Sequence, residues 1–513
     1  MEIKLQWKNK ARWATCATLM VGAAAFSGNA LALPTFARQT GWSCATCHTS
    51  YPQLTPMGRM FKLLGFTTTN LQRQQEIQAK FGKSVGLLLS RVSQFSIFLQ
   101  ASATNVGGGQ AVFGGTNLGA SPNNNVQFPQ QVSLFYAGEI TPNIGSFLHL
   151  TYSGGGSGTG GGGFSFDDSS IVWAHPWKFG ANNLLVTGVD VNNTPTAMDL
   201  WNTVPDWQAP FFSSDYSSWG HVPLPFIEGS AGAGYPLAGL GVYGADIFGP
   251  NKANWLYADA DVYTNGQGIQ TNPVGGFAAF SSGPAGRLSG AAPYVRLAYQ
   301  HDWGKWNWEI GAYGMWSSVY DASIQPGYTI VDMNGNPQTI PTGNAYNYSG
   351  GPIDTFDDYD LDTQLQWLDI NDNNNVTVRA AWVHEQQRFG GVGGTLPAGA
   401  QSANSTSPSG NLNFFNLNAT YWYHDHYGIQ GGYRDVWGSA NPGLYGTTYT
   451  NSGSPDTSDE WVELSYLPWW NTRFSLRYNI YNKFNGVGSA ASNNLNYGAS
   501  AYNTLELLAW ISY

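Results

Sequence analysis

Stretches of about ten residues in which apolar and polar side chains alternate recur along most of this 513-residue chain. In one of them, Val295 and Leu297 lie on one face of an extended strand and Arg296 lies on the other. In another, Leu464 and Glu463 lie on opposite faces. Because side chains alternate across a β-strand with a period of two, each stretch predicts a strand with one apolar and one polar face.

The composition favours a membrane barrel over a soluble β-protein. Charged residues make up 11% of the chain and aromatic residues 15%, whereas soluble proteins average about 25% charged residues. Beyond the N-terminus there is no run of the ~20 apolar residues that a membrane helix needs. A soluble β-sandwich would show the same alternation, but it would not explain strands that are apolar on the outside with aromatic residues at their ends.

Short and long connections alternate between the predicted strands, as periplasmic turns and extracellular loops do in outer-membrane barrels. The short turns lie near residues 141–145, 176–182, 249–253, 302–305, 371–374, 424–427 and 468–471. The long loops, which are rich in Gly, Ser and Asn, lie near residues 103–128, 155–163, 192–235, 264–292, 321–358, 388–411, 438–458 and 483–502. The sequence thus predicts a porin-like antiparallel barrel of about sixteen strands, with fourteen or eighteen as alternatives.

Residues 1–32 predict a signal peptide. A basic stretch that includes Lys4 and Arg12 precedes an apolar run over residues 14–26, and Ala30-Leu31-Ala32 supplies a cleavage site. We therefore expect export and an outer-membrane location. Cleavage would also remove four of the 22 basic and one of the 32 acidic residues, which leaves a net charge of −13.

The sequence Cys44-Ala45-Thr46-Cys47-His48 follows closely after this predicted cleavage site. In this motif the two thiols attach covalently to a haem, and the adjacent imidazole is the proximal ligand of its iron. A disulfide is the alternative for two cysteines of an exported protein, but His48 directly after them favours haem c. We expect one covalent haem, with Cys44 and Cys47 as attachment sites and His48 as axial ligand.

A short helix is predicted after the motif, with Thr55 as N-cap, Pro56 at its first position and a stop at Gly65. Its apolar face, which we expect to lie against the porphyrin, comprises Met57, Met60, Phe61 and Leu64. Met60 or Met57 could be the sixth ligand of the iron. The alternatives are that both methionines only pack on the haem, or that the ligand lies elsewhere.

The charge distribution suggests how this segment and the barrel fit together. Residues 33–83 hold six basic side chains and one acidic one, while the rest of the mature chain is strongly acidic. We predict a cytochrome segment over residues 33–82 that lies inside the lumen or plugs it, within a barrel formed by residues 83–513. We expect its basic side chains to meet Glu309 and Glu463, and the haem propionates to meet the inward arginines Arg296, Arg379, Arg473 and Arg477. The acidic balance disfavours nucleic acid as a partner.

Four acidic residues, Asp354, Asp357, Asp358 and Asp360, lead into a strand from a long loop. Hard oxygen ligands suit a ferrous ion, so this cluster is a candidate docking site for Fe(II). The alternative is a solvated loop face without a bound ion.

Residues 34–66 resemble the N-terminus of the fused monohaem cytochrome–porins, the outer-membrane iron oxidases of iron-oxidising bacteria. The resemblance rests on PTFARQTG over residues 34–41, on the Cys44–His48 motif, on LTPMGR over residues 54–59 and on Gly65-Phe66. It implies an oxidoreductase that oxidises extracellular Fe(II) and passes the electron to a periplasmic carrier such as a cytochrome c or a copper protein. Two alternatives stay open: the same conduit with a different extracellular donor, and a solute porin with a cytochrome plug.

Overall fold

The computed structural model of the chain describes residues 34–68, 93–108, 125–153, 163–180, 182–195, 197–203, 213–214, 216–228, 237–265, 287–320, 329–331, 337–339, 353–369, 371–390, 407–445, 452–488 and 497–513. The predicted signal peptide and the predicted domain boundary at residues 82/83 lie outside the described residues.

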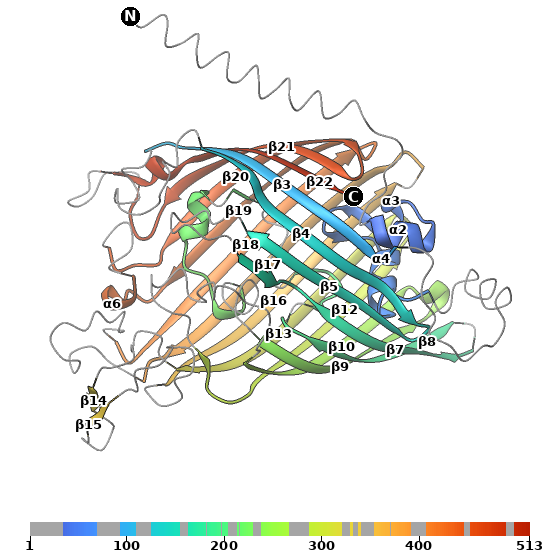
Figure 1. Cartoon of the computed structure of the whole chain (residues 1–513), viewed down its shortest axis with the longest axis horizontal. Helices are drawn as coiled ribbons and strands as arrows, with labels where there is room; N and C mark the ends of the chain where they lie inside the picture. The colour runs from blue at the N-terminus through green and yellow to red at the C-terminus, as the bar shows by residue number, and fades with distance from the viewer. Residues whose placement is uncertain are drawn as a thin grey trace, which may run out of the picture.

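The described strands form one closed antiparallel barrel, in which the last strand pairs with the first (Figure 1). Its strands are β3 (Phe95–Val106), β4 (Asn125–Thr141), β5 (Ile144–Ser153), β6 (Gly163–Phe166), β7 (Ser170–Phe179), β8 (Asn183–Asn192), β9 (Leu237–Phe248), β10 (Asn254–Asn265), β11 (Arg287–Leu288), β12 (Ala292–Trp303), β13 (Trp306–Tyr320), β16 (Ile353–Asp369), β17 (Asn374–Arg388), β18 (Ser409–Tyr423), β19 (Tyr427–Gly438), β20 (Thr457–Trp469), β21 (Thr472–Lys483) and β22 (Thr504–Ser512). A separate two-stranded sheet consists of β14 (Thr329–Val331) and β15 (Pro337–Thr339).

The barrel wall has sixteen strand positions within the described residues, as the sequence predicts. Eighteen strands carry labels, but β6 and β7 both pair with β5, and β11 and β12 both pair with β13. Each of these two pairs of strands occupies one position in the wall. An even strand count is typical of bacterial outer-membrane barrels.

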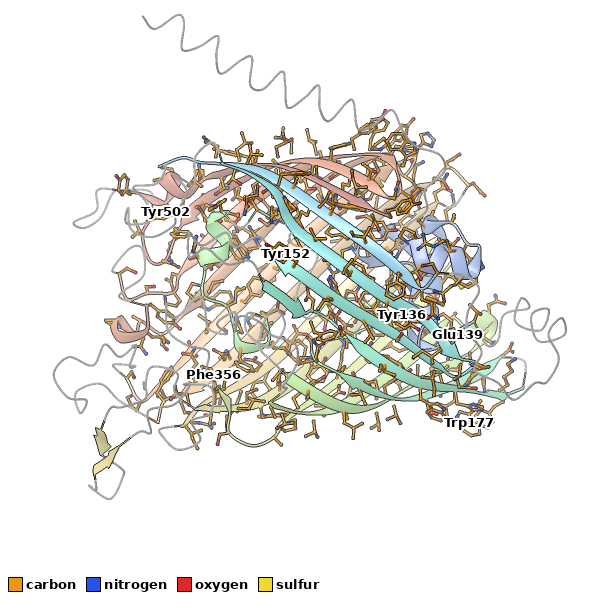
Figure 2. All side chains as sticks on the ribbon, in the orientation of Figure 1. Tyr136, Glu139, Tyr152, Trp177, Phe356 and Tyr502 are labelled. Carbon is orange, nitrogen blue, oxygen red and sulfur yellow. The ribbon has the colours of Figure 1, made fainter. Side chains whose placement is uncertain are left out.

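Alternation along the strands sorts apolar side chains to the outside and charged ones to the lumen. On β12, Leu297 is 62% exposed while Arg296 is fully buried; on β20, Leu464 faces outward and Glu463 inward. Exposed aromatic residues stand near the short turns, for example Trp177 (Figure 2). Tyr427, the first residue of β19, is another. An apolar exterior with aromatic residues at its edge is the surface that a lipid bilayer requires, so this is an outer-membrane barrel.

The short turns all lie at one rim and the long connections at the other. One such turn is the 3-10 helix η4 (Pro250–Lys252) between β9 and β10. Both ends of the barrel chain, the start of β3 and the end of β22, lie at the short-turn rim as well. In bacterial barrels this rim faces the periplasm.

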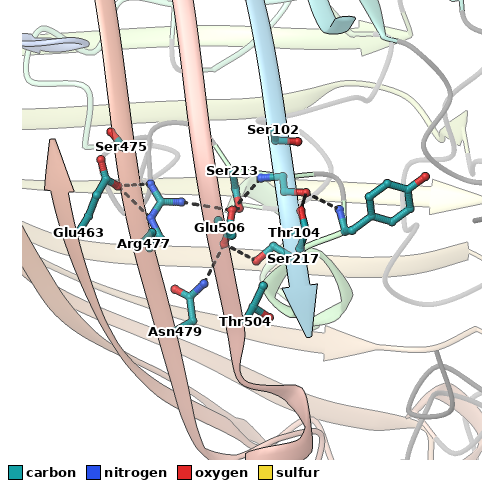
Figure 3. Close-up of polar contacts among 12 residues, drawn as sticks. Ser102, Thr104, Ser213, Ser217, Glu463, Ser475, Arg477, Asn479, Thr504 and Glu506 are labelled. Carbon is teal, nitrogen blue, oxygen red and sulfur yellow. Dashed lines mark hydrogen bonds and ion pairs between the residues drawn. The ribbon is translucent and has the colours of Figure 1, made fainter. Parts of the chain in front are cut away.

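The connection after β8 folds into the lumen, where the sequence predicts only an extracellular loop over residues 192–235. We call the described residues 193–195, 197–203, 213–214 and 216–228 the inward loop; it includes the 3-10 helix η2 (Ser218–His221). Glu506 of β22 fixes it, because its carboxylate accepts hydrogen bonds from Ser213 Oγ (2.8 Å), the Ser214 amide (2.8 Å) and Ser217 Oγ (2.9 Å) (Figure 3). Two further short helical turns, α6 (Pro442–Tyr445) and η6 (Ala499–Tyr502), lie in other connections on the long-connection side.

Residues 34–68, the N-terminal segment, occupy the short-turn end of the lumen (Figure 1). Their elements are α2 (Pro34–Thr40), α3 (Cys44–Cys47), β1 (His48–Ser50), β2 (Gln53–Leu54) and α4 (Pro56–Leu63). Hydrogen bonds join the segment to β4, to β9 and to the neighbouring strands β13 and β16, which are well separated from β4 in the closed strand order.

Among the described residues, no helix combines the length and the apolar character needed to cross a membrane.

Candidate functional site

The Cys44–His48 motif forms a single helical turn followed by a short strand. The turn brings Cys44 and Cys47 to neighbouring positions on one side, since residues three apart in a helix face the same way. The backbone amide of His48 donates to the Cys44 carbonyl and closes the turn. Both cysteines hold their sulfurs as thiols, so the disulfide considered above is not formed in this structure.

Hydrogen bonds and one close backbone contact join helix α4 to the Cys44–His48 motif. Thr55 caps the helix, as predicted, by accepting a hydrogen bond from the Gly58 amide (3.1 Å). Its own amide donates to the Cys47 carbonyl (2.9 Å), and its hydroxyl donates to the Thr46 carbonyl (2.6 Å). A Cβ at Gly58 would collide with the Cys47 carbonyl. The cap and the glycine together fix the orientation of the thiols relative to the helix.

The imidazole of His48 is the third group of the motif that could bind a haem. Its Nδ1 is buried without a hydrogen-bond partner, and its ring packs on Tyr51 with centroids 4.4 Å apart. Burial lowers the pKa of His48 to about 4, against a smaller opposing effect of the Gln53 backbone. The ring is therefore neutral at ordinary pH, and the neutral imidazole is the form that binds a metal ion.

Both thiols and this imidazole border one cavity of about 640 Å³ in the lumen. The motif lies on one side of it, and aromatic side chains such as Phe135 and Trp510 line it from the wall. Pockets for cofactors typically measure about 300–1,000 Å³ and are mostly apolar. Two thiols, a neutral imidazole and an aromatic cavity of this size fit the donor set and the space that a covalently bound haem requires.

Neither methionine of α4 borders this cavity. Met57 is 43% exposed, and Met60 is packed against the apolar cluster beside the segment. The helix turns Gly58, Phe61 and Lys62 toward the cavity instead, because the close contact between Gly58 and Cys47 sets its rotation. The structure therefore does not bring the two candidate sixth ligands to the motif.

His149 of β5 also borders the cavity, and sequence reasoning missed it. Its Nε2 lies 2.9 Å from Thr151 Oγ1, and its Nδ1 lies 3.6 Å from an Asp167 oxygen. It lies about a hundred positions from the motif in a strand of ordinary alternation. No spacing in the sequence signals that it shares a cavity with His48.

Among the described residues, the basic side chains of the N-terminal segment bind neutral oxygens rather than Glu309 and Glu463. Arg73, Lys80 and Lys83 lie outside the described residues. Arg59 donates to Asn307 Oδ1 of β13 (2.6 Å) and to Gln366 Oε1 of β16 (3.1 Å). Lys62 donates to the Asp199 carbonyl (2.6 Å). Thus Arg59 ties the segment to the wall, and Lys62 ties it to the inward loop.

The two glutamates instead pair with inward arginines of the wall. Arg296 lies 3.4 Å from Glu309, and Arg473 lies 2.7 Å from Glu463. Arg477 also pairs with Glu463 (Figure 3), and Arg379 donates to the Asn202 carbonyl (2.7 Å). These four arginines, which we expected to meet haem propionates, thus bind groups of the barrel and of the inward loop.

The four acidic residues of β16 are divided by the alternation of the strand. Asp358 and Asp360 are buried on the lumen side, whereas Asp357 points to the opposite face and pairs with Arg388 at 3.1 Å. Asp354 accepts a hydrogen bond from the Gly390 amide (3.0 Å) near the rim. Because neighbouring side chains of a strand face opposite ways, the structure does not gather these four into one site.

Comparisons with known proteins add little to this description. No protein-family model and no curated protein matches the chain. Solved structures similar to it include OprB of Pseudomonas putida (12% identity, TM-score 0.42, 82% of this chain and 93% of that one). Another is the outer membrane channel DcaP of Acinetobacter baumannii (12%, 0.39, 82% and 96%). A third is a loop-deletion form of OmpT, an outer membrane protein of Vibrio cholerae (9%, 0.40, 82% and 98%).

Proposed function

We propose that this chain is an outer-membrane oxidoreductase that takes electrons from extracellular Fe(II) and passes them to a periplasmic carrier such as a cytochrome c or a copper protein. One haem c, attached to Cys44 and Cys47 and ligated by His48, is its proposed cofactor. Such a haem, when bound, accepts and donates one electron at a time. Each Fe(II) loses one electron, and each acceptor molecule gains one.

The observation that supports the proposal most is that both thiols and the imidazole border one lumen cavity. The apolar band of an outer-membrane barrel is about 25 Å tall, and electron transfer slows steeply with distance. A single haem inside the lumen shortens the gap on both sides, which a haem hanging in the periplasm would not do.

The residues of the chain have three tasks in this proposal. Thr55 and Gly58 hold the motif in the orientation that attachment requires. Aromatic side chains such as Phe135 and Trp510 would lie beside the haem, and such an apolar surrounding influences its reduction potential. Arg59 and Lys62 fasten the segment in the lumen, so that the distance to either rim stays fixed.

A solute porin whose N-terminal segment plugs the lumen is the second candidate. It is favoured by the closed sixteen-strand wall with its polar lumen, which is the architecture of porins. It does not account for the two thiols and the imidazole at one cavity. A conduit of the same build that takes electrons from another extracellular donor is a variant of the first proposal.

Anaerobic addition of Fe(II) to the purified, oxidised full-length protein in detergent tests the proposal. We expect the absorption bands of reduced haem c to appear at a rate that depends on the Fe(II) concentration. A protein that carries covalent haem but stays oxidised would exclude Fe(II) as the donor. If the purified protein carries no covalent haem, the solute porin is the remaining candidate function.

A further inference from the structure

Three buried carboxylates, those of Asp190, Asp259 and Asp261, converge on the lumen wall. Each offers an oxygen, and these three oxygens lie within 4.8 Å of one another. Two ligands of one ion can be separated by at most twice the metal–oxygen distance, which is about 2.0–2.6 Å for hard divalent cations. A metal–oxygen distance of about 2.4 Å spans a separation of 4.8 Å, so the three oxygens are close enough for one larger hard cation as they stand. A smaller ion, with distances of about 2.1 Å, would draw the carboxylates closer together.

A glycine on the strand between them makes this convergence possible. Asp190 of β8 and Asp261 of β10 are both cross-strand partners of Gly241 in β9. A Cβ at Gly241 would collide with the carboxylate oxygens of both. A glycine within a strand often marks such a close approach, and here it leaves the space in which the carboxylates meet.

Several polar atoms around this space lack hydrogen-bond partners among the described residues. Asp259 is 3% exposed, and neither of its carboxylate oxygens has a hydrogen-bond partner. Tyr294 of β12, the cross-strand partner of Asp261, is fully buried, and its hydroxyl has no partner either. Asn192 donates to Asp190 and, at 3.3 Å, to Asp261.

No lysine or arginine of the described ranges forms an ion pair with any of the three. Buried charges without partners are costly unless they bind a metal ion or retain protons. Three like charges this close together can keep their negative charge only beside a cation.

We propose that Asp190, Asp259 and Asp261 bind one hard divalent cation, and that this is where Fe(II) docks before it is oxidised. Oxygen-only ligands suit Fe(II), Mn(II), Mg(II) and Ca(II) rather than softer metals. The choice of Fe(II) rests on the function proposed above. Asp190 and Asp261 lie toward the long-connection ends of their strands, while the N-terminal segment fills the short-turn end. The cation would therefore bind on the long-connection side of the N-terminal segment.

Mn(II) is the probe for the site, because its electron paramagnetic resonance signal separates free from bound ion. We expect the purified full-length protein in detergent to bind one Mn(II) at this site. Asp259→Asn should abolish that binding and raise the Fe(II) concentration needed for half-maximal haem reduction at least several-fold. Asp246→Asn is the same change at an exposed position of the neighbouring strand β9. It should change neither Mn(II) binding nor the Fe(II) concentration needed for half-maximal haem reduction.

A second pair of variants tests the geometry without removing a charge. Gly241→Ala should weaken Mn(II) binding because its methyl group occupies the space between the carboxylates. Gly244→Ala places the same group on the same strand, at a position where the added Cβ meets only the Val186 carbonyl at 3.4 Å, and should leave binding unchanged. Heat-modifiable gel mobility checks that each barrel is folded.

The proposed cation site is wrong if the wild-type protein binds no Mn(II), or if the Asp259→Asn variant binds Mn(II) as tightly as the wild type. In that case the three carboxylates share protons instead of a cation. The docking role is wrong if Mn(II) binding is lost while the Fe(II) dependence of haem reduction stays the same. If the wild-type protein binds Mn(II) at Asp190, Asp259 and Asp261 but Fe(II) never reduces the haem, the proposed iron oxidation is wrong and the proposed cation site is still supported.

Discussion

The two ends of the lumen are built from different side chains, although the same strands run through both. At the short-turn end, Arg59 binds amide oxygens, and a cavity with aromatic side chains begins at the motif and reaches the inward loop at Trp219. At the long-connection end, carboxylates dominate: Asp358 and Glu385 accept hydrogen bonds from amides of the inward loop at 2.8 Å and 2.6 Å. One end suits an apolar cofactor and the other suits cations.

This contrast shows that one barrel wall can carry different kinds of lumen lining at different depths. Every second residue of each strand faces the lumen, so either kind of lining can be placed at any depth without disturbing the outer surface. Buried carboxylates remain tolerable only where amide donors, arginines or cations compensate them. The acidic end has such donors for Glu506 and Glu385 but none for Asp259.

The largest expected effect comes from removing the thiols at the aromatic end. Replacing both Cys44 and Cys47 by Ala should abolish covalent haem, because each thioether bond needs its own thiol. Intact mass and haem staining of denaturing gels measure the loss. The barrel should keep its heat-modifiable mobility, since its strands begin at Phe95. Covalent haem on the double variant would refute the assigned attachment site.

The Gly58→Ala variant should also reduce haem attachment at the short-turn end, but through packing alone. The added methyl group meets the Cys47 carbonyl, a backbone atom that cannot move aside without shifting the motif. We expect a destabilisation of about 1–3 kcal/mol, typical of overpacking, and a several-fold lower haem content per barrel. Met57→Ala, one residue away on an exposed face, is the matched control and should change haem content little. Equal haem content in the two variants would contradict the described contact.

At the acidic end, Glu506→Gln tests how the inward loop is held. The amide side chain cannot accept the three loop hydrogen bonds as a carboxylate does, and bonds to charged groups contribute about 1.5–3 kcal/mol each. We expect faster proteolysis at residues 213–214 and 216–228 of the inward loop and a larger single-channel conductance in planar bilayers. Glu460→Gln changes an exposed glutamate of β20 and serves as control. Unchanged proteolysis in Glu506→Gln would mean that other contacts hold the loop.

The smallest effect is expected from Met60→Leu. Because Met60 does not border the cavity, a change that conserves its volume should cost less than about 1.5 kcal/mol. The visible and magnetic circular dichroism spectra of the haem should match those of the wild type. A change of the axial-ligand signature in this variant would revive Met60 as the sixth ligand.

The sequence predicts the wall well because strand alternation is a local property. It places Arg296 and Glu463 in the lumen and Leu297 and Leu464 outside, and it predicts the Thr55 cap from residues that are adjacent in the chain. These features depend on neighbours within a few positions, so pattern alone suffices for them.

Features that arise from pairing between distant strands could not be predicted in this way. Asp190 and Asp261 lie 71 positions apart and meet only because both are in register with Gly241. The rotation of α4 depends on one backbone contact between Gly58 and Cys47, so apolar periodicity correctly turns Phe61 toward the cavity but does not bring Met57 or Met60 to it. The partners of the inward arginines depend on strand register as well.

Electron transfer across a sealed membrane tests the central claim most directly. Full-length protein is inserted into lipid vesicles that contain oxidised cytochrome c, and Fe(II) is added outside under anaerobic conditions. We predict that one trapped cytochrome c is reduced for each Fe(II) oxidised, and that vesicles with the Cys44→Ala/Cys47→Ala barrel show no reduction. An inert wild type, or equal reduction with the variant barrel, would contradict electron transfer through a haem in the lumen.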